Sequence, residues 1–186
     1  GVGEAAPRRR PWGAAVQVPS LPGEGRSAFG DFGALREAAQ AFAAAGADAL
    51  AISPTHALFP ADVERFSPYA PSSRLFLNVL FGDPGLIGAA SAPAEATDLI
   101  AWEQSIPARL AALRQAFAAR GEGVEAEVAT YRRERGRDLE RHAVFDGLHA
   151  HFFAGGARGW QDWPQSFRDP QGDAVLVVRV LVVLPG

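Results

Sequence analysis

Residues 47–53 read "ADALAIS", and together with "WGAAVQV" at residues 12–18 they decide the fold that the sequence predicts. Each is a short apolar run bounded by turn residues, a pattern typical of a buried strand. Between them, Asp31 is placed to cap a helix and Gly46 to end it, with four apolar side chains on one face, Leu35, Ala38, Ala39 and Phe42. A strand, a helix and a second strand in this order predict a βαβ unit of the α/β class, with parallel strands and a right-handed crossover.

The segments that follow these two strands indicate where a ligand would bind. Parallel strands end at the same carboxyl edge of a sheet, so "QVPSLPGEG" (residues 17–25) and "SPTHALFP" (residues 53–60) should emerge side by side. Ligands bind at that edge in open α/β sheets and in barrels. The stretch "SPYAPSSRLFLN" (residues 67–78) comes shortly after, and its prolines, serines and tyrosine predict a loop at this edge.

The rest of the chain changes in character. Helical periodicity is visible in residues 96–123, through Leu110, Leu113 and Phe117, with Gly121 as a stop, and again in residues 125–156, through Phe145, Leu148 and Phe152. The end of the chain, "AVLVVRVLVVLPG" at residues 174–186, is rich in β-branched residues. It predicts an aggregation-prone strand over residues 175–183.

Composition excludes several classes of protein. The 186 residues are enough for one domain with a core, but fewer than the roughly 250 of a complete (β/α)8 barrel. A net charge of −3 favours neither nucleic acid nor an anionic membrane as a partner. There are no cysteines, no signal peptide and no apolar run long enough to span a bilayer, so we expect a cytoplasmic protein. The absence of methionine, even at position 1, suggests a piece of a longer chain.

Three motifs suggest chemistry, and each has a plainer interpretation. "GEGRSA" (residues 23–28) matches a dinucleotide fingerprint, but Pro19 and Pro22 separate it from its strand, so a loop is preferred over an oxidoreductase. No His–His pair has metal-ligand spacing. Asp138, His142 and Asp146 are four residues apart, a spacing that fits an ordinary polar helix face better than a metal site. We expect no cofactor and no metal.

Trp160 and Trp163 in "GWQDWP" form a further candidate. Tryptophans three residues apart can stack on a sugar ring, or they can bury their large apolar area in a core. Burial is the preferred interpretation. No carboxylate pair and no G-x-S-x-G elbow is recognisable, so the residues alone do not define a catalytic constellation.

Most of the chain resembles the amylomaltase family, the bacterial 4-alpha-glucanotransferases also called disproportionating enzymes. The matching segments are "WGAAVQVPSL" (12–21), "FGDFGAL" (29–35) and "AAAGADALAISPTHALFPADVERFSPYAPSSRLFLNVLFGDP" (43–84), in the family's order and spacing. "HALFPAD" combined with "SPYAPSSRLFLN" is highly specific. Residues 98–117 and 141–170 are similar to the family's helical insertion, so the resemblance extends to about Asp173.

The resemblance implies a fold and a ligand. The fold is a partial (β/α)8 TIM barrel, consisting of its first βα units, with an α-helical insertion subdomain. The expected organisation is a leader at 1–11, the βαβ part at 12–92, the helical insertion at 93–173 and a divergent apolar tail at 174–186. The expected partners are alpha-1,4-glucans and maltooligosaccharides. Ser67 and Tyr69 would touch sugar, as the serine and tyrosine of the family's S-P-Y motif do. Alternatively, Ser67 caps the turn at Pro68 and Tyr69 packs at a barrel rim.

The resemblance also implies what this chain lacks. The family carries out retaining glycosyl transfer with carboxylates on later barrel strands, which lie outside the matching segments. The divergent end predicts a truncated or frame-shifted copy, which we expect to be inactive alone. A non-catalytic glucan-binding or interaction module is the alternative function.

Overall fold

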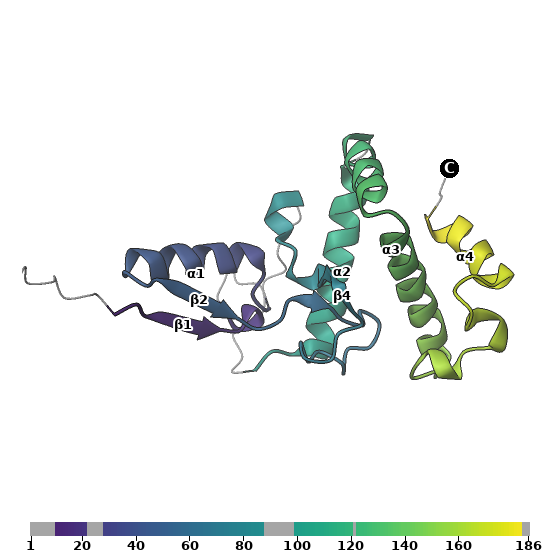
Figure 1. Cartoon of the computed structure of the whole chain (residues 1–186), viewed down its shortest axis with the longest axis horizontal. Coiled ribbons are helices and arrows are strands. Elements are labelled where there is room, and N and C mark those ends of the chain that lie inside the picture. The colour runs from purple at the N-terminus through teal and green to yellow at the C-terminus, as the bar shows by residue number, and fades with distance from the viewer. Residues whose placement is uncertain (1–9, 22–27, 88–98, 121, 184–186) are drawn as a thin grey trace, which may run out of the picture.

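The computed structural model describes residues 10–21, 28–87, 99–120 and 122–183, and it shows a mixed α/β fold with few strands. The strands are β1 (Gly13–Val16), β2 (Ala49–Ile52), β3 (His56–Ala57) and β4 (Ser73–Leu77), and the α-helices are α1 (Phe32–Ala44), α2 (Trp102–Ala119), α3 (Glu122–Ala154) and α4 (Asp173–Val183). The 3-10 turns are η1 (Val18–Ser20), η2 (Val79–Phe81), η3 (Pro84–Ile87), η4 (Trp160–Asp162) and η5 (Gln165–Phe167). Figure 1 shows an elongated arrangement, with β1, β2 and α1 at one end and α3 and α4 at the other.

The βαβ unit is confirmed. β1 and β2 pair in parallel, with Gly13 opposite Ala49 and Val16 opposite Ile52, and α1 connects them. Its caps are those that the sequence predicts. The Asp31 carboxylate accepts a hydrogen bond from the Ala34 amide at 3.1 Å, and Gly46 takes a φ of 86° beyond the last turn. Two bonds, from the Gly46 amide to the Ala43 carbonyl and from the Ala47 amide to the Phe42 carbonyl, complete a Schellman ending.

The expectation that these strands are buried is wrong for this chain. Every residue of β1 and β2 is at least partly exposed, and the Ile52 side chain is 45% exposed. Within the described part of the chain, β1 and β2 pair only with each other, so each strand has one unpaired edge. Apolar strands become buried only when neighbouring strands and helices cover them.

The first core lies where the βαβ unit meets α2. Val18, Phe29, Leu80, Phe81 and Ile106 are almost completely buried there. β3 and β4 form a second, antiparallel pair, and β4 leads directly into η2, which carries Leu80 and Phe81. The core therefore joins residues from both strand pairs to the helix that follows them.

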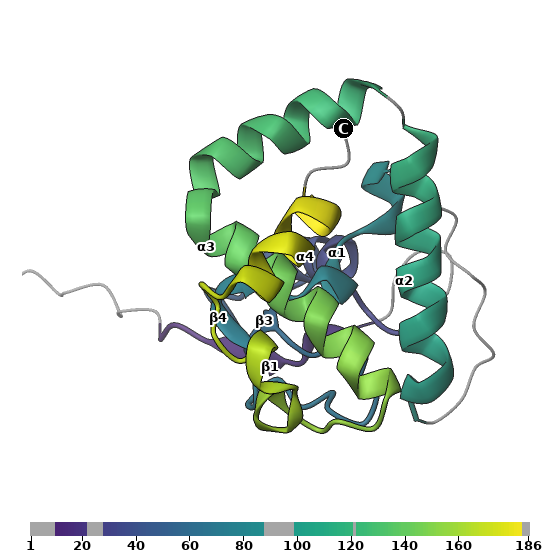
Figure 2. The same ribbon diagram turned by 90° about the vertical axis from the view of Figure 1, so that its right-hand side faces the viewer.

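The second core lies between α3 and the C-terminal segment. Val144, Leu148, Trp163 and Val175 are buried together, with Phe145, Phe152 and Phe167 among the residues packed around them. This confirms the apolar face expected through Phe145, Leu148 and Phe152. The long α3 is interrupted at Gly136, whose φ of 57° and ψ of −141° are not helical, and the chain turns there (Figures 1 and 2).

The strand predicted for residues 175–183 is wrong, because this segment forms the helix α4. Among the described residues it meets no open strand edge, whereas its Val175 packs into the second core against α3. Helical bonds satisfy the backbone locally, so this contact with α3 overrides the β propensity of the valines. No helix in the described part of the chain is both long and apolar enough to cross a bilayer.

Candidate functional site

The loop that connects β3 and β4, residues 58–72, lies beyond the carboxyl end of β2 and is held at its base by Ser72. The Ser72 hydroxyl shares its one proton between the Leu58 carbonyl at 2.6 Å and the Ala57 carbonyl at 3.1 Å. The Ser72 amide also donates to the Ala57 carbonyl at 2.8 Å. Because both ends of the loop are tied together, less conformational entropy remains to be lost when a ligand binds.

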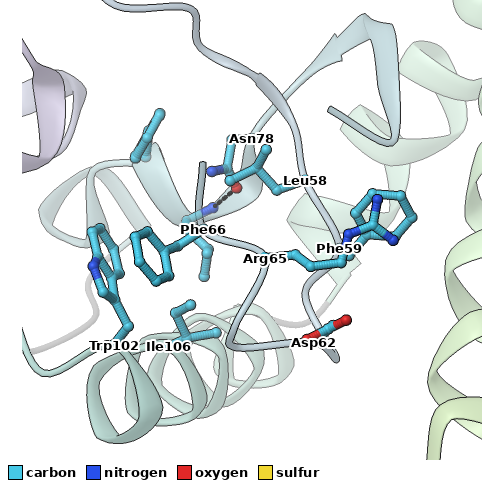
Figure 3. A pocket seen from close by; sticks show the side chains of 10 residues that line it. Leu58, Phe59, Asp62, Arg65, Phe66, Asn78, Trp102 and Ile106 are labelled. Carbon is cyan, nitrogen blue, oxygen red and sulfur yellow. Dashed lines mark hydrogen bonds between the residues drawn. The ribbon is translucent and has the colours of Figure 1, made fainter. Parts of the chain in front are cut away.

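The inner side of this loop packs against α2, as Figure 3 shows. The Phe66 ring stacks on Trp102 of α2, with centroids 5.2 Å apart and planes 11° apart. Asp62 is 3% exposed, and its carboxylate accepts from the Glu64 amide at 3.3 Å. The remaining cavity measures about 10 Å³, which is room for one water molecule at most. The inner side is therefore packed and offers no substrate pocket.

The outer side of the loop carries both residues that the resemblance singles out. Ser67 and Tyr69 are exposed, and 72% of Tyr69 is accessible to solvent. The backbone carbonyl of Ser67, rather than its hydroxyl, accepts from the Ala70 amide at 3.2 Å and closes a four-residue turn with Pro68 in its second position. In this chain Tyr69 does not pack into a core, so its hydroxyl and ring face are available to a ligand.

A second helix, α3, contacts the same loop through aromatic side chains. His149 is 2% exposed, and its ring lies 5.0 Å from Phe59 of the loop and 5.6 Å from Phe153. Burial, and secondly the charge of Arg65, lower the pKa of His149, while Asp62 acts in the opposite direction. His149 is therefore a neutral ring of α3 that packs against the loop. Its Nε2 has no hydrogen-bond partner among the described residues.

His142 and Asp146 meet on α3, but not as a metal site. His142 Nε2 lies 3.6 Å from Asp146 Oδ2, and the imidazole stacks on Phe76 of β4 with centroids 4.8 Å apart. Burial raises the pKa of Asp146 to about 7 and lowers the pKa of His142. Near neutral pH the His142 imidazole is therefore mostly neutral, whereas the Asp146 carboxyl is in the middle of its titration. Asp138 is exposed, and no group of three potential metal ligands converges among the described residues.

Sequence reasoning found the loop but missed what supports it. His149 and Phe59 join α3 to the loop across 90 positions of sequence, and nothing in the local pattern distinguishes His149 from His151. A buried position at a helix–loop contact becomes visible only when the elements are packed. The "GEGRSA" motif at residues 23–28 lies almost wholly outside the described residues.

A parallel βαβ unit followed by an anchored, tyrosine-bearing loop beyond the carboxyl end of its second strand defines a mixed α/β protein. The chain belongs to the 4-alpha-glucanotransferase family, whose sequence profile matches residues 16–180. The match extends past Asp173, where the sequence analysis expected the resemblance to end.

Three relatives carry the same description, 4-alpha-glucanotransferase. The protein of Haemophilus influenzae is 41% identical over 75 residues, which are 40% of this chain and 11% of that protein. The proteins of Mycobacterium bovis and Mycobacterium tuberculosis are each 29% identical over 191 aligned positions, which cover 90% of this chain and 26% of theirs. The chain thus spans about a quarter of the length of the mycobacterial relatives.

Proposed function

We propose that this chain is part of a 4-alpha-glucanotransferase, which transfers alpha-1,4-glucan segments between maltooligosaccharides, and that it supplies one wall of the glucan groove. The observation that carries the proposal is the loop of residues 58–72, closed at its base by Ser72 and presenting an exposed Tyr69. Membership of the 4-alpha-glucanotransferase family supports an alpha-glucan as the sugar.

The chemistry of Ser67 and Tyr69 suits a sugar. The tyrosine ring offers a face for the apolar side of a glucose ring, and its hydroxyl can both donate to and accept from a sugar hydroxyl. The Ser67 hydroxyl is a second such group, two residues away on the same turn. Pro68 and Pro71 restrict the loop before a ligand arrives, which reduces the ordering cost of binding.

The proposed architecture is the beginning of a (β/α)8 barrel. β1, α1 and β2 are its first units, residues 12–92 form the barrel part, and residues 93–173 form a helical insertion subdomain that packs on it. The parallel pairing of β1 with β2 and the exposure of both strands support this assignment, because further barrel strands would pair with their free edges.

The proposed reaction is retaining transfer. A carboxylate nucleophile would form a covalent glycosyl intermediate, and a second carboxyl group, about 5 Å away, would act first as acid and then as base. We place these carboxylates in the regions of the relatives that this chain does not span. The chain alone is then expected to bind glucan without transferring it.

Two measurements on the purified chain test this function. Binding of maltoheptaose, followed by titration calorimetry, should weaken about tenfold at the loop site in Tyr69→Ala, because the sugar-stacking face is lost. Tyr131→Ala is the matched control, since Tyr131 is the other tyrosine and is 43% exposed on α3. Equal affinities in the two variants would show that Tyr69 does not contact the bound glucan.

The second measurement addresses catalysis. Incubation with maltotriose should yield neither glucose nor longer glucans, and transfer by the chain alone would show that the catalytic carboxylates lie within it. A non-catalytic glucan-binding module would give the same result. Co-expression with a relative from which the segment matching this chain has been deleted separates the two, because only a true part of the enzyme should restore transfer.

A further inference from the structure

A cleft of about 790 Å³ lies between the second half of α3, the η4–η5 segment and α4. In Figure 1, α3 lies between β4 and α4, and Val175 and Leu176 of α4 line the cleft. Its volume falls within the roughly 300–1,000 Å³ of typical small-molecule sites. The cleft is separate from the small packed space under the loop of residues 58–72, and the proposed function does not use it.

The floor of the cleft is apolar and buried. Val144, Leu148, Trp163 and Val175 line it, and all four belong to the second core. Trp160 also lines the cleft but is 48% exposed, whereas Trp163 is 4% exposed. The preferred interpretation of "GWQDWP" as a burial motif therefore fits Trp163, while Trp160 presents part of its indole to solvent beside the cleft.

The rim of the cleft carries donors and acceptors of both charges. Arg137, Arg141 and Arg168 supply guanidinium groups, and Glu140, Asp169 and Gln171 supply oxygens. Arg168 Nε donates to the Trp163 carbonyl at 2.7 Å, which anchors that side chain to the floor. Within the described part of the chain, none of the three arginines has a carboxylate at ion-pair distance.

This combination selects one class of ligand. An anion would meet the Asp169 carboxylate as well as the arginines, and a purely apolar segment would desolvate the charged groups of the rim. A neutral polyhydroxylated chain can use donors and acceptors together and can lay an apolar ring face on an indole. We propose that the cleft is a second alpha-glucan site, with Trp160 as its stacking platform and Arg141 and Gln171 as polar contacts.

The identity of the sugar rests on the proposed function, but the location does not. A glucan held in this cleft would lie between α3 and α4, whereas the loop that carries Ser67 and Tyr69 contacts α3 through Phe59. α3 links the two places, because Phe145 lies 6.3 Å from Phe59 of the loop and 5.6 Å from Trp163 of the cleft floor, measured between ring centroids. Two sites on one chain would allow it to hold a long glucan at two points and gain avidity.

The test is titration of the full 186-residue chain with maltoheptaose, read by calorimetry and by tryptophan fluorescence. Trp160→Ala should lower affinity at one class of sites at least about tenfold and abolish the associated fluorescence change. Trp12→Ala is the matched control, because Trp12 is 47% exposed and lies in the segment before β1. Arg141→Ala, at an exposed position, provides a second variant whose folding the substitution should not affect, and it should weaken the same sites.

The outcomes separate this proposal from the proposed function. Binding lost in Tyr69→Ala but unchanged in Trp160→Ala and Arg141→Ala overturns the cleft site and leaves the groove intact. Binding lost in Trp160→Ala but unchanged in Tyr69→Ala supports the glucan site in the cleft and contradicts the proposed glucan contact at Tyr69. A wild-type chain that binds no maltoheptaose, or that binds only glucose 1-phosphate through the arginines, overturns the cleft as a glucan site.

Discussion

The guanidinium group of Arg109, in α2, donates to the carboxylate of Asp31, the N-cap of α1, at 3.1 Å. Their side chains are only 6% and 11% exposed, although the residues are 78 positions apart in sequence. Arg109 also donates to the carbonyls of Phe29 at 3.1 Å and Gly82 at 3.2 Å. One side chain therefore joins the helical part of the chain to the start of the βαβ helix and to the turn after η2.

Replacing Arg109 with alanine should destabilise the whole chain. The change leaves the Asp31 carboxylate and two carbonyls without their buried partner, and losing one member of such a pair costs about 3–5 kcal/mol. That is a large share of the roughly 5–15 kcal/mol that stabilises a typical domain. Urea denaturation followed by circular dichroism measures the change. Arg114→Ala, at an exposed position on the same helix, is the control, and equal midpoints for the two variants would contradict the assigned role of Arg109.

The buried carboxyl of Asp146 should make stability depend on pH. Burial raises its pKa from 3.8 to about 7 in the folded chain, so the native state holds this proton more tightly than the unfolded state. The protonated Asp146 carboxyl contributes to the free energy of unfolding at low pH, and this contribution is lost as pH rises from 3.8 to about 7. The lowered pKa values of His142 and His149 have the opposite effect, because the stability that these neutral imidazoles contribute to the fold is lost as pH falls below 6.5.

The variant Asp146→Asn isolates this effect. Its free energy of unfolding, relative to the parent chain, should rise between pH 5 and pH 8 by an amount on the order of 2 kcal/mol, allowing for solvent at the partly exposed carboxyl. Denaturant titrations at several pH values give the comparison. Asp138→Asn, at an exposed position eight residues earlier in α3, is the control. A difference for Asp146→Asn that stays constant with pH would show that the carboxyl is not protonated in the folded chain.

Val175 should contribute measurably to stability as an anchor of α4. It is 5% exposed in the second core, whereas Val177 of the same helix is 61% exposed. Truncation of the buried valine to alanine removes packed methyl groups and should cost roughly 1–2 kcal/mol, while Val177→Ala should change stability by about 0.5 kcal/mol or less. Chemical denaturation compares the two. This result would also mean that deleting residues 174–186 uncovers Trp163 and lowers solubility, contrary to what a strand-like tail would predict.

The exposed face of β4 should promote self-association of the isolated chain. Leu75 and Leu77 are 71% and 62% exposed, and β4 pairs only with the two-residue β3 in the described residues. Apolar strands with an open edge invite pairing with other chains. The double change Leu75→Ser and Leu77→Ser should shift light scattering toward the monomer at a given concentration. If Leu86→Ser, at an exposed position outside the strands, has the same effect, the apolar face of β4 is not the specific cause.

The sequence by itself determined the elements whose signals are local. Asp31 and Gly46 delimit α1 through bonds to amides and carbonyls within a few residues, and the apolar spacing of Phe145, Leu148 and Phe152 defines a helix face. The loop with Ser67 and Tyr69 was also found from sequence, because its prolines, serines and tyrosine predict a loop and the resemblance to a family singles out these two residues. The sequence predicted neither the exposure of this loop nor the hydrogen bond that the Ser67 backbone carbonyl accepts in its turn.

Only the tertiary structure decided the properties that depend on which elements meet. Residues 175–183 have strand propensity, but Val175 finds its contacts on α3, and without an open strand edge nearby among the described residues the segment satisfies its backbone as a helix. Trp160 and Trp163 are three positions apart and chemically identical, yet the packing of α3 and α4 buries one and leaves the other beside a cleft. Burial is a property of two surfaces together, and a single stretch of sequence specifies only one of them.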